Sequence, residues 1–477
     1  MRLKEILVNV EVLNEYSDTE VTGLIFDAKN VKEGDLFFCL IGSNFDGHNF
    51  AIDAMERGAA AIVCERELNL RIPCVIVKNT RMAMSLISSE FFGSPSEKLK
   101  IVTVTGTNGK TSTTYILDSI LRQAGLKTGI IGTNGIKIGD RFLPHTLTTP
   151  DPIELNKTLR DMADAGVEVV CMEVSAHAIY LNKLCGIRAK VGIFTNCTQD
   201  HLDYFKTMEN YKRVKKSYFD KLYIEYGLVN IDDELGLEIY RESNAQILTY
   251  GEKNPSDIFS INFEDTDNGI KFVVNLFDDI FAVECRLFGK FNMFNVMAAV
   301  GAAKILKIDN NDIIEGLASI DKIDGRFNVV YNKAFRVIID FAHSPDSLLN
   351  VLKVARLVTK NRLICVFGCG GNRDREKRQI MGRIAAEYAD FCVVTSDNPR
   401  YEDPMEIINE IEKGVRKNCS NYVLIENRSR AIAYSLKTAQ LGDTVIICGK
   451  GAETYQEIAG IKHEYNDNDA VLNLLSN

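Results

Sequence analysis

The stretch TVTGTNGKTST at residues 103–113 decides the central part of the fold. It overlaps the apolar run IVTVT at residues 101–105, and the run TSTTYILDSILRQAG that follows has helical spacing and stops at Gly125. An apolar run, a glycine-rich turn and an amphipathic helix in this order predict a βα unit with a phosphate-binding turn.

Within the turn, Gly106 and Gly109 allow the backbone to bend and to expose N–H groups towards phosphates. Lys110 supplies a cation and Thr111 supplies a hydroxyl for Mg²⁺. The usual eight-residue pattern needs a glycine where this chain has Val104, so this is a shortened loop, G-x-x-G-K-T. The alternative is a glycine turn with an incidental lysine. We expect the phosphates to lie against the following residues: Gly106, Thr107, Asn108, Gly109, Lys110, Thr111 and Ser112.

On both sides of this unit, and along all 477 residues, β-rich runs alternate with helical patterns, which predicts an α/β protein. Three domains are expected, at residues 1–98, 99–325 and 326–477: an N-terminal domain, a central parallel sheet like that of P-loop ATPases, and a C-terminal Rossmann-like, doubly wound sheet. The topology of residues 235–285, which are rich in strand-like runs, is not predicted.

Five strand-like runs in the last domain each end in a polar cluster: DFAHSPDS, GCGGNRDREKR, SDNPR, ENRSR and GKGAETYQ. Ligands of doubly wound sheets bind beyond the carboxyl ends of the strands, so these clusters predict a binding crevice. In the central domain Glu173, His201 and Asp203 also follow strand-like runs, where they suit Mg²⁺. The alternative is that such histidines are packed or hydrogen-bonded; four of the six, His48, His177, His201 and His343, lie in loop motifs.

The amino-acid composition excludes some classes of protein. A hydrophobic content of 46%, 25% charged residues and a net charge of −9 indicate a globular protein without a large basic surface for nucleic acid. Residues 1–20 lack the apolar core of a signal peptide, and no run has the length of a membrane span. The twelve cysteines contain no CxxC pair and are expected to be reduced. We expect a cytoplasmic protein, acting as a monomer without nucleic-acid or membrane partners.

Ten motifs taken together resemble those of the Mur ligase family, in the family's order. They are GTNGKTS, LTTPD, EVSAHA, TNCTQDHLDYF, GKFNMFNVMAA, GRF, DFAHSPDSL, FGCGGNRDREKR, DNPR and GKGAETYQ. The resemblance covers nearly the whole chain and is strongest to members that add the third residue of the cell-wall stem peptide. It implies that the three domains hold a uridine nucleotide, ATP with Mg²⁺, and an amino acid.

In such enzymes ATP phosphorylates a peptide carboxylate and the incoming amine attacks the acyl phosphate. The resemblance assigns catalytic roles to Lys110, Glu173, His201 and Lys215, and metal binding to Thr111, Glu173, His201 and Lys215. It places Asn292, Asn295, Arg326, Asp340 and His343 at the ATP, and Thr148, Thr149, Ser175 and Lys183 at the UDP-linked muramoyl dipeptide.

Lys215 lies in YKRVKKSYF at residues 211–219, which matches the segment where the family carries a carbamylated lysine. Carbamylation gives a lysine a carboxylate, which explains how it could serve a metal. The alternative is that Lys212, Lys215 and Lys216 form a solvated helix face, and Lys216 is the neighbouring choice of register.

The amino acid implied by the resemblance is meso-diaminopimelate, because the DNPR motif supplies an arginine for a distal carboxylate. The residues implied for it are Arg373, Asp397, Asn398, Pro399, Arg400, Gly449 and Glu453. A lysine-adding enzyme is the nearest rival, and Arg400 speaks against it, because L-lysine lacks the distal carboxylate and would leave the guanidinium unpaired.

Five positions depart from the family's usual residues: Ala28, Lys29, Ala176, Lys183 and Ala452. Because of these departures, the resemblance defines the contacts to the UDP-linked substrate less closely than it defines the ATP site.

We also weigh four rival classes of protein: a D-Ala-D-Ala-adding ligase, a folate-polyglutamate-type ligase, a P-loop transporter or motor, and a nucleotide-dependent regulator that does not ligate. The DNPR and GCGGNRD motifs speak against the first, and the DGH segment of the first domain against the second. The shortened loop disfavours the third. The complete set of Lys110, Glu173, His201 and Lys215 argues against the fourth.

Overall fold

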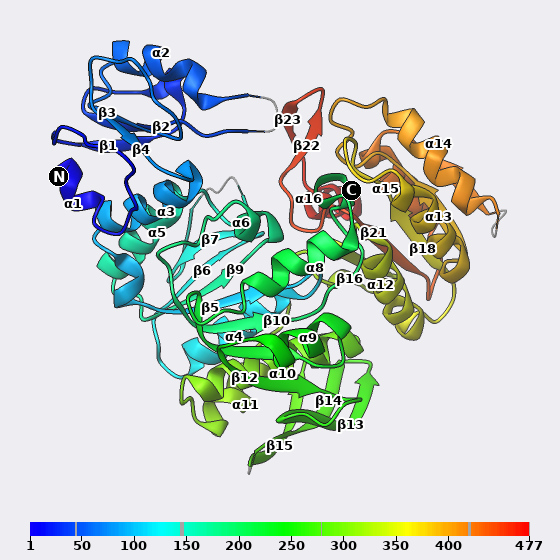
Figure 1. Ribbon diagram of the computed structural model, residues 1–477. Helices are drawn as coiled ribbons and strands as arrows, with labels where there is room; N and C mark the ends of the chain where they lie inside the picture. Colours follow the sequence, from blue (N-terminus) through cyan, green and yellow to red (C-terminus); the bar gives the residue numbers. More distant parts are fainter. Residues whose placement is uncertain (43–44, 144–146, 278, 418–420, 477) are drawn as a thin grey trace.

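The structure is a computed structural model that describes residues 1–42, 45–143, 147–277, 279–417 and 421–476. Its strands form a four-stranded, an 11-stranded and a six-stranded sheet, together with a two-stranded hairpin. Figure 1 shows the three larger sheets as separate layered bodies, with the central one between and below the other two. The three sheets follow one another along the chain, while the exact boundaries after residues 98 and 325 remain predictions.

The N-terminal sheet is parallel throughout, in the order β1-β2-β3-β4. Its strands are β1 Gly23–Ile25, β2 Asp35–Phe38, β3 Ala61–Cys64 and β4 Cys74–Ile76. The helices of this part are α1 Leu3–Ile6, η1 Ala28–Asn30, η2 Gly47–Phe50, α2 Ala51–Glu56, α3 Thr80–Phe91 and η3 Pro95–Lys98. All four residues of β2 and of β3 are buried, which explains their largely apolar sequence.

The 11-stranded sheet is parallel in its middle and antiparallel at both ends, in the order β15-β14-β13-β12-β11-β10-β5-β9-β6-β7-β8. Its first strands are β5 Lys100–Thr105, β6 Thr128–Gly132, β7 Gly135–Ile138, β8 Arg141–Leu143, β9 Val169–Glu173 and β10 Ala189–Phe194. The others are β11 Ile224–Asn230, β12 Gln246–Gly251, β13 Ile258–Thr266, β14 Gly269–Leu276 and β15 Asp279–Cys285. Residues 235–285, whose topology the sequence did not predict, therefore extend the same sheet, first by the parallel strands β12 and β13 and then by the antiparallel strands β14 and β15.

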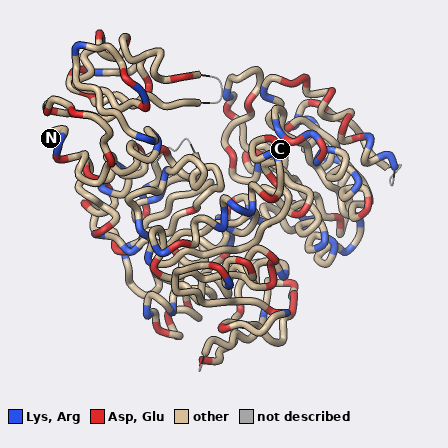
Figure 2. Tube along the Cα trace, viewed as in Figure 1, with Lys and Arg blue, Asp and Glu red and all other residues tan. Residues whose placement is uncertain are grey.

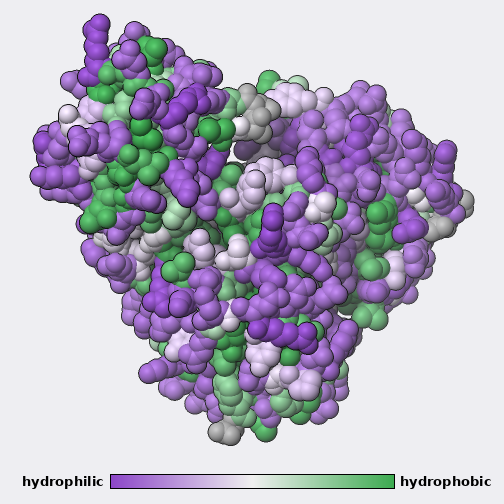
Figure 3. Space-filling model, viewed as in Figure 1, coloured by the Kyte–Doolittle hydropathy of each residue, from purple (hydrophilic) through white to green (hydrophobic). Residues whose placement is uncertain are grey.

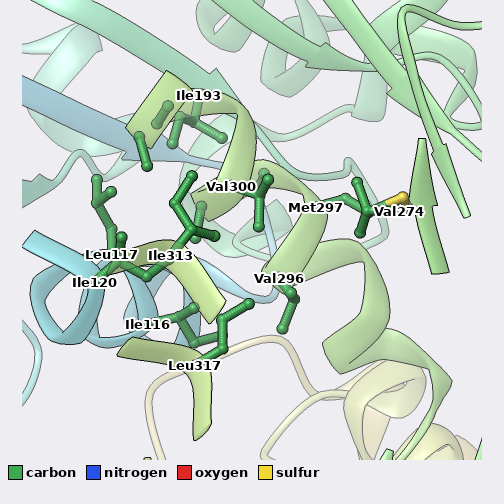
Figure 4. Packing of buried hydrophobic residues seen from close by; sticks show 14 of the residues in the cluster. Ile116, Leu117, Ile120, Ile193, Val274, Val296, Met297, Val300, Ile313 and Leu317 are labelled. Atoms are coloured by element: carbon green, nitrogen blue, oxygen red, sulfur yellow. The ribbon is translucent and has the colours of Figure 1, made fainter. Parts of the chain in front are cut away.

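Two layers of helices cover this sheet. They are α4 Lys110–Gln123, α5 Pro152–Asp164, α6 Ala176–Tyr180, α7 Leu202–Phe205, α8 Met208–Ser217, α9 Glu234–Glu242, α10 Lys290–Ile305 and α11 Asn310–Ala318. Helices α4, α10 and α11 pack on one face, where Ile116, Val296 and Ile313 meet the strand residue Ile193 (Figure 4). Eleven residues of α10 are buried, so this helix is apolar nearly all round, as its interior position requires.

The C-terminal sheet has the order β16-β17-β21-β18-β19-β20, with β16 antiparallel to the rest. Its strands are β16 Asn328–Asn332, β17 Arg336–Asp340, β18 Leu363–Phe367, β19 Phe391–Val394, β20 Tyr422–Leu424 and β21 Thr444–Cys448, and the hairpin comprises β22 Tyr455–Ile458 and β23 Ile461–Glu464. The helices are α12 Pro345–Val358, α13 Glu376–Tyr388, α14 Pro404–Val415, α15 Arg428–Thr438 and α16 Asp467–Leu475.

Alternate residues of these strands point to two different cores, which confirms the doubly wound prediction. Cys365 and Ile446 pack with α12, α13 and α14, whereas Ile364 and Val445 pack with α15 and α16. All five runs predicted as strands of this sheet are strands in the structure.

The molecule carries residues of both charges, as the near-balanced numbers of acidic and basic residues lead one to expect. Figure 2 shows positive and negative residues interspersed along the chain it draws, and Figure 3 shows the molecule hollowed between its N-terminal and C-terminal parts. Among the described residues no helix combines the length and apolar character that crossing a membrane requires. The cysteines in the described part are free thiols, and most are buried.

Candidate active site

The glycine-rich loop between β5 and α4 leaves no room for a side chain at two positions. Gly106 and Gly109 have φ values of 153° and 87°. A Cβ atom on Gly106 would lie 1.8 Å from Thr195 Oγ1, and one on Gly109 would lie 2.4 Å from Asn295 Oδ1. Since α4 begins at Lys110, the positive end of the helix faces this loop, as the predicted phosphate site requires.

Lys110 lies at the centre of the loop. Its Nζ donates hydrogen bonds to the carbonyl oxygens of Gly106 at 2.9 Å and Thr107 at 2.8 Å. Burial lowers the pKa of Lys110, the Glu173 carboxylate raises it, and the Arg326 guanidinium lowers it again. A buried ammonium held by carbonyl groups is suited to bind phosphate oxygens without a large rearrangement.

Glu173 ends β9 and is completely buried. Its Oε1 accepts hydrogen bonds from Thr111 Oγ1 and from the Thr133 backbone N–H, both at 2.9 Å, and its Oε2 accepts one from Thr133 Oγ1 at 3.0 Å. A Cβ atom on Gly132 would lie 2.4 Å from Oε1, so a glycine is needed there for the carboxylate to fit. The carboxylate is thus fixed beside the first turn of α4.

Arg326 joins this group from the connection to the C-terminal sheet. Its guanidinium donates to Thr111 Oγ1 at 2.7 Å and lies 4.7 Å from the centre of the Phe341 ring. Its Nε is buried, and this donor has no hydrogen-bond partner within the described part of the chain. A buried guanidinium with an unused donor beside a phosphate loop fits an anionic ligand.

Asn292, Asn295 and Asp340 complete the predicted ATP side. Asn295 Nδ2 donates to Asn292 Oδ1 at 2.9 Å, and Asn295 Oδ1 accepts from Thr113 Oγ1 at 3.4 Å. Asp340 accepts from the backbone N–H groups of Phe327 and Ala342, both at 2.7 Å. Burial raises the pKa of Asp340. Its carboxylate therefore shapes the strand end as well as facing the crevice.

His201 has a strained backbone at the start of α7, with a φ of 56°. Its ring packs edge-on against His177, with the ring centres 5.0 Å apart, and its Nε2 lies 3.6 Å from Asp200 Oδ2. Burial holds the pKa of His201 well below its ordinary value, so its ring is neutral. His48, in contrast, has a structural role: Nδ1 bonds Asp46 Oδ1 at 2.6 Å and Nε2 accepts from the Glu65 N–H at 2.9 Å.

The buried lysine of α8 is Lys215, which is 1% exposed. Its Nζ lies 4.7 Å from the centre of the Tyr211 ring, and no ion-pair partner is found for it among the described residues. Burial lowers the pKa of Lys215 to about 7, and Lys110 contributes to this lowering. Lys212 and Lys216 instead lie at the surface and pair with Glu234 and Glu242. The burial of Lys215 excludes the solvated-face alternative for this residue and favours its register over that of Lys216.

The donor set near the loop fits Mg²⁺. Thr111 and Glu173 offer hard oxygen ligands within 2.9 Å of each other, and Mg²⁺ commonly takes one or two carboxylates with substrate phosphates. Within the described ranges no group of three His, Cys, Asp or Glu side chains lies close enough to hold a metal ion. Thr111 and Glu173 therefore offer a divalent ion two ligand oxygens of the protein, and substrate phosphates would supply others.

The residues predicted to contact the muramoyl peptide lie together near the end of β9. Thr149 Oγ1 donates to Glu173 O at 2.9 Å and accepts from the Ser175 N–H at 3.0 Å, and Thr148 Oγ1 lies 3.2 Å from Thr133 Oγ1. Lys183 is buried and pairs with Asp151 at 2.8 Å. Ser175 also caps α6, so several of these side chains hold the loop in shape.

The residues predicted for the amino acid gather at the ends of β19 and β21. Asn398 Nδ2 donates to Glu453 Oε2 at 3.0 Å, and Arg400 donates to Gly371 O at 2.9 Å. Asp397 Oδ2 is buried without a hydrogen-bond partner in the described part of the chain, above Gly449, where a Cβ atom would lie 2.5 Å from it. An unused carboxylate oxygen suits an ammonium group.

Arg373 lies at the border of that group, since a Cβ atom on Gly370 would lie 2.8 Å from Arg400 Nη1 and 3.7 Å from Arg373 Cγ. Its side chain is about half exposed, and it pairs with Asp203 of the central part, at 3.7 Å. This ion pair is one of several contacts across the crevice: Asn108 Nδ2 donates to Asp346 Oδ2 at 2.8 Å, and Gln199 Nε2 to Asp374 Oδ2 at 3.5 Å. His343 lies beside this boundary, where Lys377 Nζ donates to its carbonyl oxygen at 3.0 Å. The phosphate loop is thus in direct contact with helix α12 of the C-terminal part.

Sequence reasoning missed Thr133, Lys450 and Glu457. Thr133 supplies two of the hydrogen bonds to Glu173, and its signal was a polar residue just after a buried strand. Lys450 is fully buried, and its Nζ donates to Asn398 Oδ1 at 3.0 Å and to Glu453 Oε2 at 2.7 Å. It lies inside a motif that was already singled out. Nothing in the sequence indicated Glu457.

Comparison with known proteins matches three successive segments of the chain to family models. Residues 20–92 match the Mur ligase family catalytic domain, residues 104–303 the Mur ligase middle domain, and residues 325–451 the Mur ligase glutamate ligase domain.

Two relatives share the name UDP-N-acetylmuramoyl-L-alanyl-D-glutamate–2,6-diaminopimelate ligase. The one from Geobacillus thermodenitrificans is 43% identical over 456 residues, 94% of this chain and 93% of its own length. The one from Aquifex aeolicus is 41% identical over 95% of this chain and 94% of its own length. A solved structure with that name aligns with a TM-score of 0.68 at 30% identity, over 96% of this chain and 95% of that one. The fold is also shared with MurF ligase from Thermotoga maritima in complex with ADP, with a TM-score of 0.63 at 22% identity, over 96% of this chain and 97% of that one.

Proposed function

The chain belongs to the Mur ligase family, and we propose that it joins meso-diaminopimelate to UDP-N-acetylmuramoyl-L-alanyl-D-glutamate at the expense of ATP. One observation carries the proposal: a phosphate loop whose Thr111 bonds the buried Glu173 carboxylate and Arg326 is in direct contact with the C-terminal part through Asn108 and Asp346. Relatives at 41–43% identity over nearly the whole chain are named for this reaction, which favours it over lysine addition.

The chemistry needs an activated carboxylate. A carboxylate is a poor electrophile, so transfer of the γ-phosphoryl group to it supplies a leaving group, and the amine then attacks the acyl phosphate and releases phosphate. Lys110 and the start of α4 would bind the phosphates that exchange in this step, and Arg326 would neutralise charge on the same side. Thr111 and Glu173 would hold Mg²⁺, which would neutralise the phosphate charge when bound.

Lys215 fits a carbamylated role. A lysine reacts with CO₂ only as the neutral amine, and burial lowers the pKa of Lys215 to about 7, which provides that form near neutral pH. Carbamylation replaces a buried cation by a carboxylate, and this removes the repulsion from Lys110 that lowers the pKa of Lys215. His201, neutral and oriented, would complete the oxygen and nitrogen ligands on that side.

The second cluster would hold the amino acid. Arg400 would bind the distal carboxylate, whereas Glu453 and the unpaired Asp397 Oδ2 would accept from ammonium groups. L-Lysine would leave the guanidinium without its anion. The proposal places the reaction in the cytoplasm, where ATP is available, and takes the chain as a monomer.

None of the departures from the usual family residues replaces a residue assigned to the phosphates. Lys29 is in the short helix η1, where its backbone N–H bonds the Asp27 side chain, and Lys183 keeps a buried ion pair with Asp151. Ala452 contacts the connection at Gly325, where a Cβ would meet the Ala452 N–H at 2.4 Å.

The test is the dependence of phosphate release on both partners. Phosphate should be released from ATP and Mg²⁺ only when the UDP-linked dipeptide and meso-diaminopimelate are both present. Release that needs neither of them, or that needs the nucleotide substrate alone, would instead indicate the non-ligating alternative.

A further inference from the structure

The hairpin β22–β23 lies directly against the loop that carries Arg400, and its contacts concentrate on one residue. The Arg400 N–H donates to the Glu457 carbonyl oxygen at 3.1 Å, and the Glu457 N–H donates to Asn398 Oδ1 at 2.9 Å. The backbone of Glu457 is therefore fixed to this loop from two sides. Gln456 adds a third contact, because its Nε2 donates to Asp397 O at 2.6 Å.

The side chain of Glu457 contacts the guanidinium as well. Its Oε2 lies 3.2 Å from Arg400 Nε, and both side chains are about one-fifth exposed. On its other edge the guanidinium donates from an Nη atom to Gly371 O at 2.9 Å. Arg400 itself has a φ of 55°, an uncommon conformation for a residue with a side chain, so its backbone needs outside support.

These contacts leave one edge of the guanidinium for a ligand. A guanidinium has five N–H donors in a rigid plane and binds a carboxylate through two parallel ones. Nε lies beside the Glu457 carboxylate and one Nη donor is used by Gly371 O, so the donors left for a substrate carboxylate are the remaining N–H groups of the terminal nitrogens. A carboxylate that approached the Nε edge would meet the negative Glu457.

We propose that Glu457 is a positioning residue that determines how Arg400 presents its guanidinium to the distal carboxylate of the amino-acid substrate. This inference rests on the proposed function and adds a residue that does not touch the substrate. A surface ion pair of ordinary kind would contribute about 0–1 kcal/mol and would not affect the substrate. Glu457 differs from such a pair because its backbone is already anchored to the same loop, so pairing costs the freedom of the side chain but not that of the backbone.

The experiment compares Glu457→Ala and Glu457→Gln with the wild-type enzyme in steady-state ligation. Glu457→Ala should raise KM for meso-diaminopimelate about tenfold, equivalent to about 1.4 kcal/mol, while kcat and the KM values for ATP and the UDP-linked dipeptide stay within about twofold. Glu457→Gln keeps the size of the side chain and an acceptor oxygen but removes the charge, so its KM should lie between those of the wild type and Glu457→Ala.

Glu464→Gln is the matched control, since Glu464 lies on the neighbouring strand opposite Tyr455 and is exposed. It should behave like the wild type. An unchanged KM in Glu457→Ala would overturn the inference, and a lowered KM would overturn it by showing that Glu457 competes with the substrate carboxylate instead. A change in kcat or in all three KM values would indicate a general structural role and would also overturn it. Absence of ligation by the wild-type enzyme would instead remove the proposed function itself, and this inference with it.

Discussion

Thr111 Oγ1 donates a hydrogen bond to Glu173 Oε1 at 2.9 Å, and the same hydroxyl accepts one from the Arg326 guanidinium at 2.7 Å. One hydroxyl thereby links the first turn of α4, the end of β9 and the connection to the C-terminal sheet. Because the hydroxyl both donates and accepts, it orients a buried anion and a buried cation at once.

Thr111→Val keeps the shape of the side chain and removes both bonds. We expect ligation to fall about 10- to 100-fold, because each hydrogen bond to a charged group contributes about 1.5–3 kcal/mol. Thr111→Ser, which keeps the hydroxyl, should retain most of the activity. Initial rates of phosphate release at saturating substrates measure the effect, and equal rates for the valine and serine variants would contradict it.

Lys110→Ala should abolish most ligation without unfolding the protein. The buried ammonium is held by two loop carbonyls, and loss of one preorganised charge at a transferring phosphoryl group costs on the order of 10²- to 10³-fold in rate. Lys100→Ala, at the exposed start of the same strand β5, is the matched control. Circular dichroism measures the folding of both variants, and phosphate release measures their ligation. An active Lys110→Ala would contradict the role of Lys110 in binding phosphate.

Much of the fold could be predicted because its parallel strands are buried on both faces and read as short apolar runs, as in β5 and β21. The antiparallel end of the central sheet could not be. In β13 the alternation of buried and exposed residues breaks down, and a register shift between Ile261 and Glu264 interrupts its pairing. In β15 burial does alternate, but exposed positions hold the apolar residues Ile280 and Ala282, so the sequence does not show it.

Some residues of the candidate site could also be predicted from the sequence, and others could not. Lys110 and Arg400 lie in motifs whose order along the chain could be recognised, and the roles assigned to them stay predictions. Thr133 and Glu457 come from segments with no such motif, and only the packing of the sheets brings them to Glu173 and Arg400. Likewise, only burial separates Lys215 from Lys216, which differ by one position on a helix.

Lys215→Ala should lose ligation and recover part of it when a small carboxylate such as formate or acetate is added at high concentration. The removed side chain leaves a buried space next to Tyr211, and an exogenous carboxylate can replace the carbamate there. Lys216→Ala is the control and should remain active, since Lys216 pairs with Glu238 and Glu242 at the surface.

Mass spectrometry of the native protein gives an independent measurement, with a mass increase on Lys215 that is lost in CO₂-free buffer. Recovery by chloride as strong as by formate would contradict the carbamate account, because chloride supplies no carboxylate.

Lys450→Met should destabilise the protein by about 3–5 kcal/mol, because it leaves the largely buried Glu453 against Asn398 without its cation. The double variant Lys450→Met/Glu453→Gln should recover part of that loss, since both charges are then gone. Urea unfolding followed by circular dichroism measures the free energies. A double variant less stable than Lys450→Met would show that the two side chains do not act as a pair.

The most direct test offers meso-diaminopimelate and L-lysine in parallel to the wild-type enzyme with ATP, Mg²⁺ and UDP-N-acetylmuramoyl-L-alanyl-D-glutamate, and identifies the product by mass spectrometry. We expect a tripeptide product and matching phosphate release with meso-diaminopimelate. With L-lysine we expect little or no product, because Arg400 then has no distal carboxylate to bind. A product formed equally well with L-lysine would contradict the account of the amino-acid site, and no product with either would contradict the proposed reaction.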